Sequence, residues 1–200
     1  MKPMLRLAVP AAIALALGAC SLSSLLGGGK APPYLLTLTS QAPATGEFTR
    51  SAAPGEAVTI ATPVIPKELR TIRIPVHVTP TAIEYVTDLQ WADTPDKLFQ
   101  TLIAETVTRM TRRVVLDGDQ AALDPGLVVS GQLSRFGYDD SEAAVVVRYD
   151  AALSTAGGTR VETRRFEAKV PSTPDAAGIG PALNTAANQV AMDVAKWVGG

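Results

Sequence analysis

The chain has 200 residues, of which 46% are hydrophobic, and its 18 basic and 19 acidic side chains give a formal net charge of −1 at pH 7. Because no block of Lys and Arg stands out, the composition argues against nucleic-acid binding, which depends on clustered cations facing phosphates. A single cysteine excludes a disulfide within the chain. The stability of the folded part therefore has to come from a packed core.

The first twenty residues have the three-part layout of a secretory signal peptide. Two cations precede an almost entirely apolar stretch at residues 7–17, and small residues then lead to Cys20. The apolar stretch is too short to span a bilayer as a helix. The tetrapeptide LGAC that ends at Cys20 resembles the lipobox of bacterial lipoproteins, in which the thiol is acylated and the chain is cut before it. We expect residues 1–19 to be a lipoprotein signal peptide and Cys20 to carry the lipid. The alternative is an ordinary signal peptide that happens to contain a cysteine.

A tether is predicted to follow the anchor at residues 20–33. Its residues after the cysteine read SLSSLLGGGKAPP, which is small and flexible and then stiffened by proline. Thirteen such residues reach roughly 20 Å. Ser21 stands where enterobacterial lipoproteins that stay in the inner membrane commonly carry Asp, so we expect the outer membrane, with the domain facing the periplasm. Residues 34–200 are long enough for one domain with a sizeable core.

Strand patterns dominate the first part of this domain. Runs of β-branched and apolar residues predict strands at residues 34–39, 57–65, 69–78 and 81–87. Proline, glycine and small polar residues between the first two predict a loop at residues 41–55. Pro75 cannot donate a ladder hydrogen bond, which predicts that its strand lies at a sheet edge or contains a bulge.

A helix is predicted next, with Asp93 or Thr94 as its cap and Pro95 in its first turn. Apolar residues recur at helical spacing from Leu98 to Met110, which predicts a core-facing stripe.

The remaining elements are a short strand, three longer strands and a final helix. They are predicted at residues 114–116, 127–138, 143–153, 160–170 and 175–198, with Gly157-Gly158 as the turn between the last two strands. Together the elements predict a single α/β domain of the α+β type, a mostly antiparallel sheet with two main helices packed on one side.

Residues that could carry catalysis or bind metal form no recognisable constellation. His77 is the sole histidine and no nucleophile motif accompanies it, so a partly exposed strand residue is the better interpretation. The acidic residues at 117–119 and 139–142 lack the ligand spacing of an EF-hand and favour turns. Trp91 with Asp93 is interpreted as a packing anchor and a helix cap. We therefore expect no catalytic residue, no metal site and no cofactor; without a phosphate-binding loop, ATP hydrolysis would belong to another subunit.

Several motifs occur in an order that points to a known family. They are IEYV at residues 83–86, LQWAD at 89–93, Pro95 with LFQ at 98–100, SRF at 134–136, TRRF at 163–166, and an alanine-rich last helix that ends at Trp197. With the lipobox, these motifs resemble the ABC-type transport auxiliary lipoprotein family, an accessory component of bacterial lipid-transport systems built around MCE-domain proteins. The resemblance runs from about Tyr34 to Trp197.

The resemblance implies a non-enzymatic accessory lipoprotein that helps to move phospholipids or similar lipids across the periplasm between the inner and outer membranes. Its implied partners are an MCE-domain protein, the associated ABC permease and ATPase, and the membrane itself through the lipid anchor; bound phospholipid and self-association are left open. The loop at residues 41–54 and the edge of the Pro75 strand are the candidate partner surfaces. Two alternatives remain: a periplasmic lipoprotein hydrolase and a purely structural envelope lipoprotein.

Overall fold

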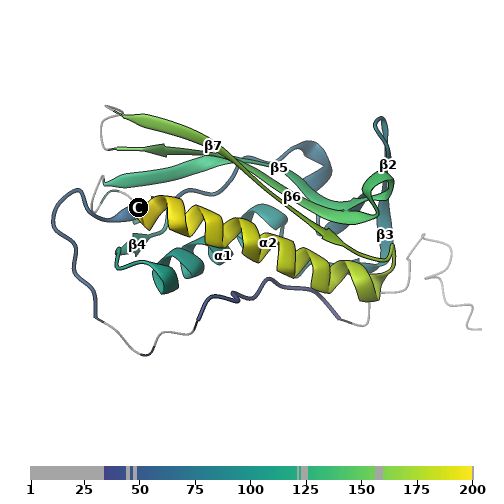
Figure 1. The fold of residues 1–200 in the computed structure, drawn as a ribbon, viewed down its shortest axis with the longest axis horizontal. Coiled ribbons are helices and arrows are strands. Elements are labelled where there is room, and N and C mark those ends of the chain that lie inside the picture. Colours follow the sequence, from purple (N-terminus) through teal and green to yellow (C-terminus); the bar gives the residue numbers. More distant parts are fainter. Residues whose placement is uncertain are drawn as a thin grey trace, which may run out of the picture. The chain divides into compact units, whose positions relative to one another are not determined.

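The structure is a computed structural model that describes residues 34–43, 46, 49–120, 122, 126–155 and 160–199 (Figure 1). Its helices are α1 (Pro95–Met110) and α2 (Ala176–Gly199), with 3₁₀ turns η2 (Lys67–Leu69) and η3 (Asp140–Glu142). Its strands are β1 (Val58–Ile60), β2 (Arg73–Thr79), β3 (Ala82–Gln90), β4 (Val115–Leu116), β5 (Leu127–Asp139), β6 (Ala144–Ser154) and β7 (Val161–Pro171). The two helices, β3 to β7 and the 117–119 turn confirm the elements predicted there.

The longest strand, β5, is the axis of the sheet. One of its edges pairs with β6 in antiparallel register, and β6 pairs in the same way with β7. Its other edge is divided: Leu127 begins a short parallel pairing with β1, and Asp139 at the far end pairs in parallel with His77 of β2. Beyond these strands β4 extends β1 and β3 extends β2. The sheet is therefore mixed, with its long ladders antiparallel, and its outer side splits into two short wings.

Both helices lie on one face of β5–β7, as predicted (Figure 1). Alternate residues of a strand point to opposite faces, and here the two faces differ sharply in chemistry. Towards the helices point the buried Leu133, Phe136, Tyr149 and Phe166. Away from them point charged side chains, which form the network described below. One face is therefore core and the other is exposed.

Aromatic rings at the centre of the core join the helical layer to the sheet. Phe99 of α1 lies edge-on to Tyr149 and Phe136, with ring centroids 5.4 and 6.1 Å apart. Trp91, the residue after β3, lies 5.4 Å from Phe136. Each fully buried side chain of this size contributes about 1.5–3 kcal/mol. The core-facing stripe predicted for α1 is confirmed except at its last member, Met110, which is 37% exposed.

The strand predicted at residues 34–39 is wrong. Only Leu36 pairs, through a single isolated parallel bridge to Trp91: its N–H donates to the Gln90 carbonyl and its carbonyl accepts from the Ala92 N–H. The following residues bond to side chains of α2 instead, so their backbone does not continue a ladder. The strand predicted at residues 57–65 shortens to β1, after which only Val64 makes an isolated bridge.

The edge position proposed for Pro75 is also wrong, because β2 lies between β3 and β5. The alternative, a bulge, is confirmed by the register shift between Arg73 and Pro75. A side chain at Gly137 of β5 would place its Cβ 2.3 Å from the Pro75 carbonyl oxygen, so glycine lets the two strands approach. Of the strand predicted from residue 69, Leu69 belongs to the η2 turn and residues 70–72 form bends. The turn proposed at Gly157-Gly158 lies outside the described residues.

Candidate functional site

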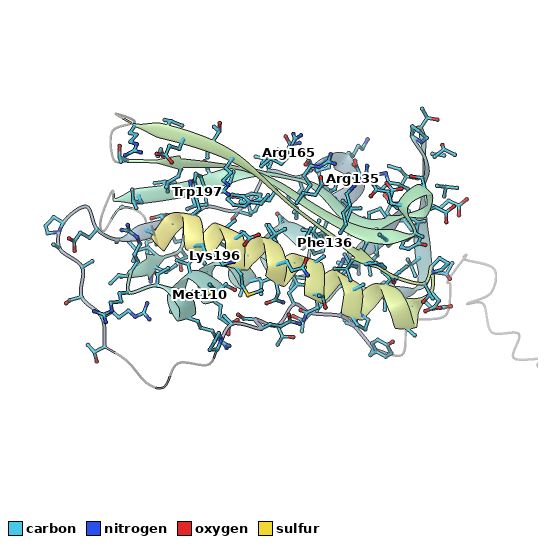
Figure 2. The ribbon with its side chains drawn as sticks, viewed as in Figure 1. Met110, Arg135, Phe136, Arg165, Lys196 and Trp197 are labelled. Atoms are coloured by element: carbon cyan, nitrogen blue, oxygen red, sulfur yellow. The ribbon has the colours of Figure 1, made fainter. Side chains whose placement is uncertain are left out.

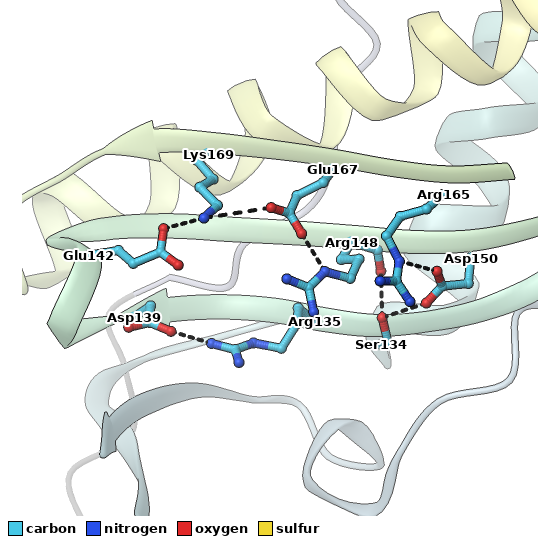
Figure 3. A network of polar contacts seen from close by, with 9 residues as sticks. All are labelled: Ser134, Arg135, Asp139, Glu142, Arg148, Asp150, Arg165, Glu167 and Lys169. Carbon is cyan, nitrogen blue, oxygen red and sulfur yellow. Dashed lines mark hydrogen bonds and ion pairs between the residues drawn. The ribbon is translucent and has the colours of Figure 1, made fainter. Parts of the chain in front are cut away.

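The face of β5–β7 turned away from the helices carries a network of polar side chains (Figure 3), here called the charged face. Its members are Ser134, Arg135, Asp139, Glu142, Arg148, Asp150, Arg165, Glu167 and Lys169. The antiparallel register creates it, because Arg148 stands opposite Glu167 and Asp150 opposite Arg165 on neighbouring strands. Opposite charges placed in this way stabilise a sheet modestly.

Every carboxylate on the charged face has a cationic partner. Asp150 accepts hydrogen bonds from Arg165 and, at 3.0 Å, from the Ser134 hydroxyl, and these bonds hold its pKa below the ordinary value. Glu167 accepts from Arg148 and lies 3.6 Å from the Lys169 ammonium, and its pKa is lowered as well. The face is thus electrically balanced within itself.

Asp139 is the most deeply placed carboxylate of this face, with 12% of its side chain exposed. Burial by itself raises its pKa, but hydrogen bonds from Ser141 and Arg135 outweigh that effect and hold the pKa below the ordinary value. The Ser141 hydroxyl donates at 2.6 Å and its backbone N–H at 3.1 Å. Asp139 therefore ties the end of β5 to the η3 turn.

His77 is half-buried on β2, in register with Asp139. Burial and the nearby Arg135 lower the pKa of its imidazole, which favours the neutral form at physiological pH. Although His77, Asp139 and Ser141 lie close in the fold, the serine hydroxyl donates to the aspartate. A nucleophilic serine needs the histidine as its acceptor, so this arrangement differs from a catalytic triad. The prediction of a partly exposed strand histidine is confirmed.

Two asparagines that the sequence analysis passed over hold the segment that follows the tether. We call residues 36–42 the N-terminal strap. The Asn188 side chain accepts from the Gln41 N–H at 2.6 Å and donates to the Thr39 carbonyl at 2.9 Å. Asn184, one turn earlier on α2, accepts from the Thr39 N–H at 2.9 Å. Asn188 is fully buried, so these amides satisfy strap backbone that no strand pairs. The spacing of these two asparagines, i and i+4 on one side of a largely apolar helix, was the sequence signal that could have identified them.

A pocket of about 650 Å³ lies where the two helices end (Figure 2). Met110, Arg112, Val114, Ala195 and Lys196 contribute to its lining. Its cations are largely engaged: Lys196 lies 2.9 Å from Asp193, and Arg113 donates to the Val198 carbonyl at 2.9 Å. Positive side chains near helix C-termini complement the helix dipole, which accounts for this cluster without a ligand.

The other residues singled out from the sequence have structural positions. Trp91 is a buried anchor, as predicted. Of the two residues proposed as the cap of α1, Thr94 occupies the N-cap position, but no side chain makes a capping hydrogen bond; Asp93 accepts only from the Thr94 N–H, at 2.7 Å. Cys20 and the tether lie outside the described residues. Among the described residues, no group of three or more potential metal ligands comes together, and no helix is long and apolar enough to cross a membrane.

Comparison with known proteins identifies the family. A family model described as the ABC-type transport auxiliary lipoprotein component matches residues 34–195. The chain belongs to this family. Among curated proteins, none matches the sequence.

Solved structures show the same fold at low sequence identity. The crystal structure of a Xanthomonas campestris protein of the DUF330 family aligns with a TM-score of 0.65 and 18% identity, covering 85% of this chain and 94% of that one. That of an uncharacterized protein aligns with a TM-score of 0.58 and 10% identity, covering 76% and 94%. A weaker similarity, to a dodecameric PelC from Paraburkholderia phytofirmans, has a TM-score of 0.42 at 13% identity, covering 72% and 92%, and is not evidence for a shared fold.

Several aromatic residues of the motifs through which the sequence resembles this transport auxiliary family lie in the core, whereas residues 83–86 and 163–165 are exposed or half-buried. Trp91 contacts Phe136, Phe136 contacts Phe99, and Phe166 of β7 lies 5.5 Å from Trp197 of α2. These residues position the elements of the domain. The exposed residues of the motifs, at 83–84 and 163–165, are part of the surface of the domain.

Proposed function

We propose that this protein is a non-enzymatic accessory subunit of an ABC-type, MCE-associated transporter that moves phospholipids or similar lipids across the periplasm. The match of the auxiliary-component family to residues 34–195 carries the proposal. ATP hydrolysis and the membrane-spanning path are assigned to the permease and ATPase subunits, and the MCE-domain protein is the partner in the periplasm.

The anchor is the second part of the proposal. Residues 1–19 are removed as a signal peptide, Cys20 is acylated, and residues 20–33 connect the lipid to the domain. The N-terminal strap begins three residues after this tether and is fastened along α2 by Asn184 and Asn188. A domain attached so closely to a membrane meets its partners at a high effective concentration, so a weak interface suffices.

The test is purification of the tagged full-length lipoprotein from detergent-solubilised membranes, with the bound proteins identified by mass spectrometry. An MCE-domain protein with its permease and ATPase should co-purify, and an unrelated tagged lipoprotein from the same membrane should not bring them down. Absence of all three subunits, together with turnover of a lipid or glycan by the purified protein, would replace the accessory role with the hydrolase alternative.

The membrane in which the protein is anchored is tested separately. Because Ser21 follows the lipidated cysteine, we expect the protein in outer-membrane fractions of a density gradient from an enterobacterial host. Ser21→Asp should move it to the inner-membrane fractions. Co-migration of the unchanged protein with inner-membrane markers alone would contradict this part of the proposal.

A further inference from the structure

The β2–β3 hairpin and the beginning of α2 lie at the end of the domain opposite the C-terminus (Figure 1). A groove of about 500 Å³ lies between them. Its apolar lining comes from Val76 and Val78 of β2, Val86 of β3 and the Pro174–Ala176 region before and at the start of α2. All five successive residues 84–88 of β3 line it. Since neighbouring residues of a strand point to opposite faces, the groove opens onto the strand backbone as well as onto one face.

The charge of this groove is entirely negative. Glu84, Asp88, Asp140 and Asp175 line it, and no Lys or Arg does. Asp175 is engaged in capping α2, where its carboxylate accepts from the Gly178 N–H at 2.8 Å. The other three have no cationic partner among the described residues, in contrast to the carboxylates of the charged face, each of which has one.

The strand beside this groove has a free edge. Within the described part of the chain β3 pairs with β2 alone, and Leu36 covers its outer side only at the last residue, where the Leu36 N–H donates to the Gln90 carbonyl. Natural sheets protect such edges with charged side chains, especially Lys, and the edge strand β7 carries Glu162, Arg164, Arg165, Glu167 and Lys169. β3 carries only two charges, both acidic, and leaves Ile83 41% exposed. Its edge is therefore poorly protected against pairing.

We propose that this groove binds an extended segment of a partner protein that adds a strand to β3 and places Lys or Arg side chains against Glu84 and Asp88. Backbone pairing would supply affinity, and the acidic, valine-lined groove would select alternating basic and apolar side chains. A second copy of this chain is disfavoured as the occupant, because two β3 strands side by side would bring like charges together. The inference rests on the proposed function only in requiring that a partner protein exists.

The experiment uses the full-length acylated protein in detergent micelles and a fluorescent heptapeptide of alternating lysine and valine, with binding measured by fluorescence anisotropy. We expect saturable binding that weakens as salt is raised. The glutamate–valine peptide should not bind. Of two N-methylated versions, with methyl groups on the lysine or on the valine backbone nitrogens, one should fail to bind, because alternate N–H groups face the pairing strand.

Charge removal gives the matched protein variants. Glu84→Gln with Asp88→Asn should weaken binding about tenfold, the size expected of two exposed ion pairs. Asp117→Asn with Asp119→Asn removes the same charge from an exposed turn and should leave binding unchanged. Both variants change surface residues, and equal thermal melting curves would confirm that they are folded.

If both double variants weakened peptide binding equally, the net charge of the protein would explain the binding, and the proposal would be overturned. Equal binding of all the peptides would also overturn the proposal. Self-association of the wild type that is lost in the Glu84→Gln, Asp88→Asn variant would overturn it as well, because a second copy of the chain would then occupy the groove. Failure of the wild type to bind the lysine–valine peptide overturns the groove proposal whether or not transporter subunits co-purify. Peptide binding without co-purification supports the groove and contradicts the proposed transporter.

Discussion

Trp91, the residue after β3, packs against Phe136 in the second half of β5, with ring centroids 5.4 Å apart and planes tilted by 43°. This contact fastens the β2–β3 wing to the axis of the sheet. Both side chains are almost completely buried. The position of the acidic groove therefore depends on the packing of two residues that do not line it.

Phe136→Ala should lower the free energy of unfolding by about 3–5 kcal/mol, because it removes a buried ring and leaves a cavity between Trp91 and Phe99. Urea denaturation monitored by tryptophan fluorescence measures the change. Trp197→Ala is the matched aromatic control: its ring is half-buried against Phe166, so its cost should be clearly smaller. A larger loss of unfolding free energy for Trp197→Ala than for Phe136→Ala would contradict the placement of the core centre around Phe136.

Tyr149→Phe should leave stability unchanged or raise it by about 1 kcal/mol. The Tyr149 hydroxyl is buried without a hydrogen-bond partner among the described residues, and burial raises its pKa far above the ordinary value. Removing an unsatisfied polar group removes its desolvation cost while the ring keeps its contact with Phe99. Urea denaturation measures this change too. A decrease of more than about 1 kcal/mol in the free energy of unfolding would mean that the Tyr149 hydroxyl has a hydrogen-bond partner.

Asn188→Ala should release the N-terminal strap without unfolding the domain. It removes the acceptor for the Gln41 N–H and the donor to the Thr39 carbonyl, at a cost of about 2 kcal/mol. Hydrogen exchange should quicken about tenfold or more at residues 39–42 and much less in β5 and β6. Thr185→Ala, on the neighbouring exposed position of α2, is the control and should leave strap exchange unaltered. Uniform acceleration across the sheet would contradict a local role.

Asp139→Asn should destabilise the protein at neutral pH by about 1–3 kcal/mol, because it weakens the bonds from Arg135 and Ser141. The pKa of Asp139 is lower in the folded than in the unfolded chain, so its contribution is complete above the ordinary value of 3.8 and is lost as the pH falls through the folded value. The difference between wild type and variant should therefore shrink on acidification. Glu162→Gln, whose partner Arg160 is 74% exposed, should change stability by less than about 1 kcal/mol at any pH.

Cys20→Ser should block lipid attachment, because the serine hydroxyl cannot form the thioether to the lipid. Mass spectrometry of the mature wild-type N-terminus should show an acylated Cys20, and the variant should keep its signal peptide or lose its membrane association. More than one acyl chain is expected, since a single chain binds a membrane only marginally, with about 0.8 kcal/mol contributed by each buried CH₂. A free thiol at Cys20 in the membrane-bound protein would contradict the anchor.

The sequence alone was sufficient to predict the helices and strands in which apolar residues recur at a regular spacing over many positions. The spaced apolar residues of α1 and α2 and the long alternating strands β5 to β7 lie where their patterns indicate. Pro95 stands at the first position of α1, where proline is favoured, so the start of this helix could be predicted from neighbouring residues alone. The family, too, was recognisable from motifs whose order survives without the fold.

Tertiary structure alone decided which strands are neighbours, and with that every candidate surface. Pro75 removes one backbone donor, but this does not predict that β2 lies inside the sheet. Its neighbour on that side, β5, begins about fifty residues later in the chain. The strap became an extended segment rather than a strand because two asparagines of α2, almost 150 residues away, satisfy its backbone. The acidic groove likewise brings β3 beside the start of α2. Pairing and burial are non-local, so no window of the sequence contains both partners.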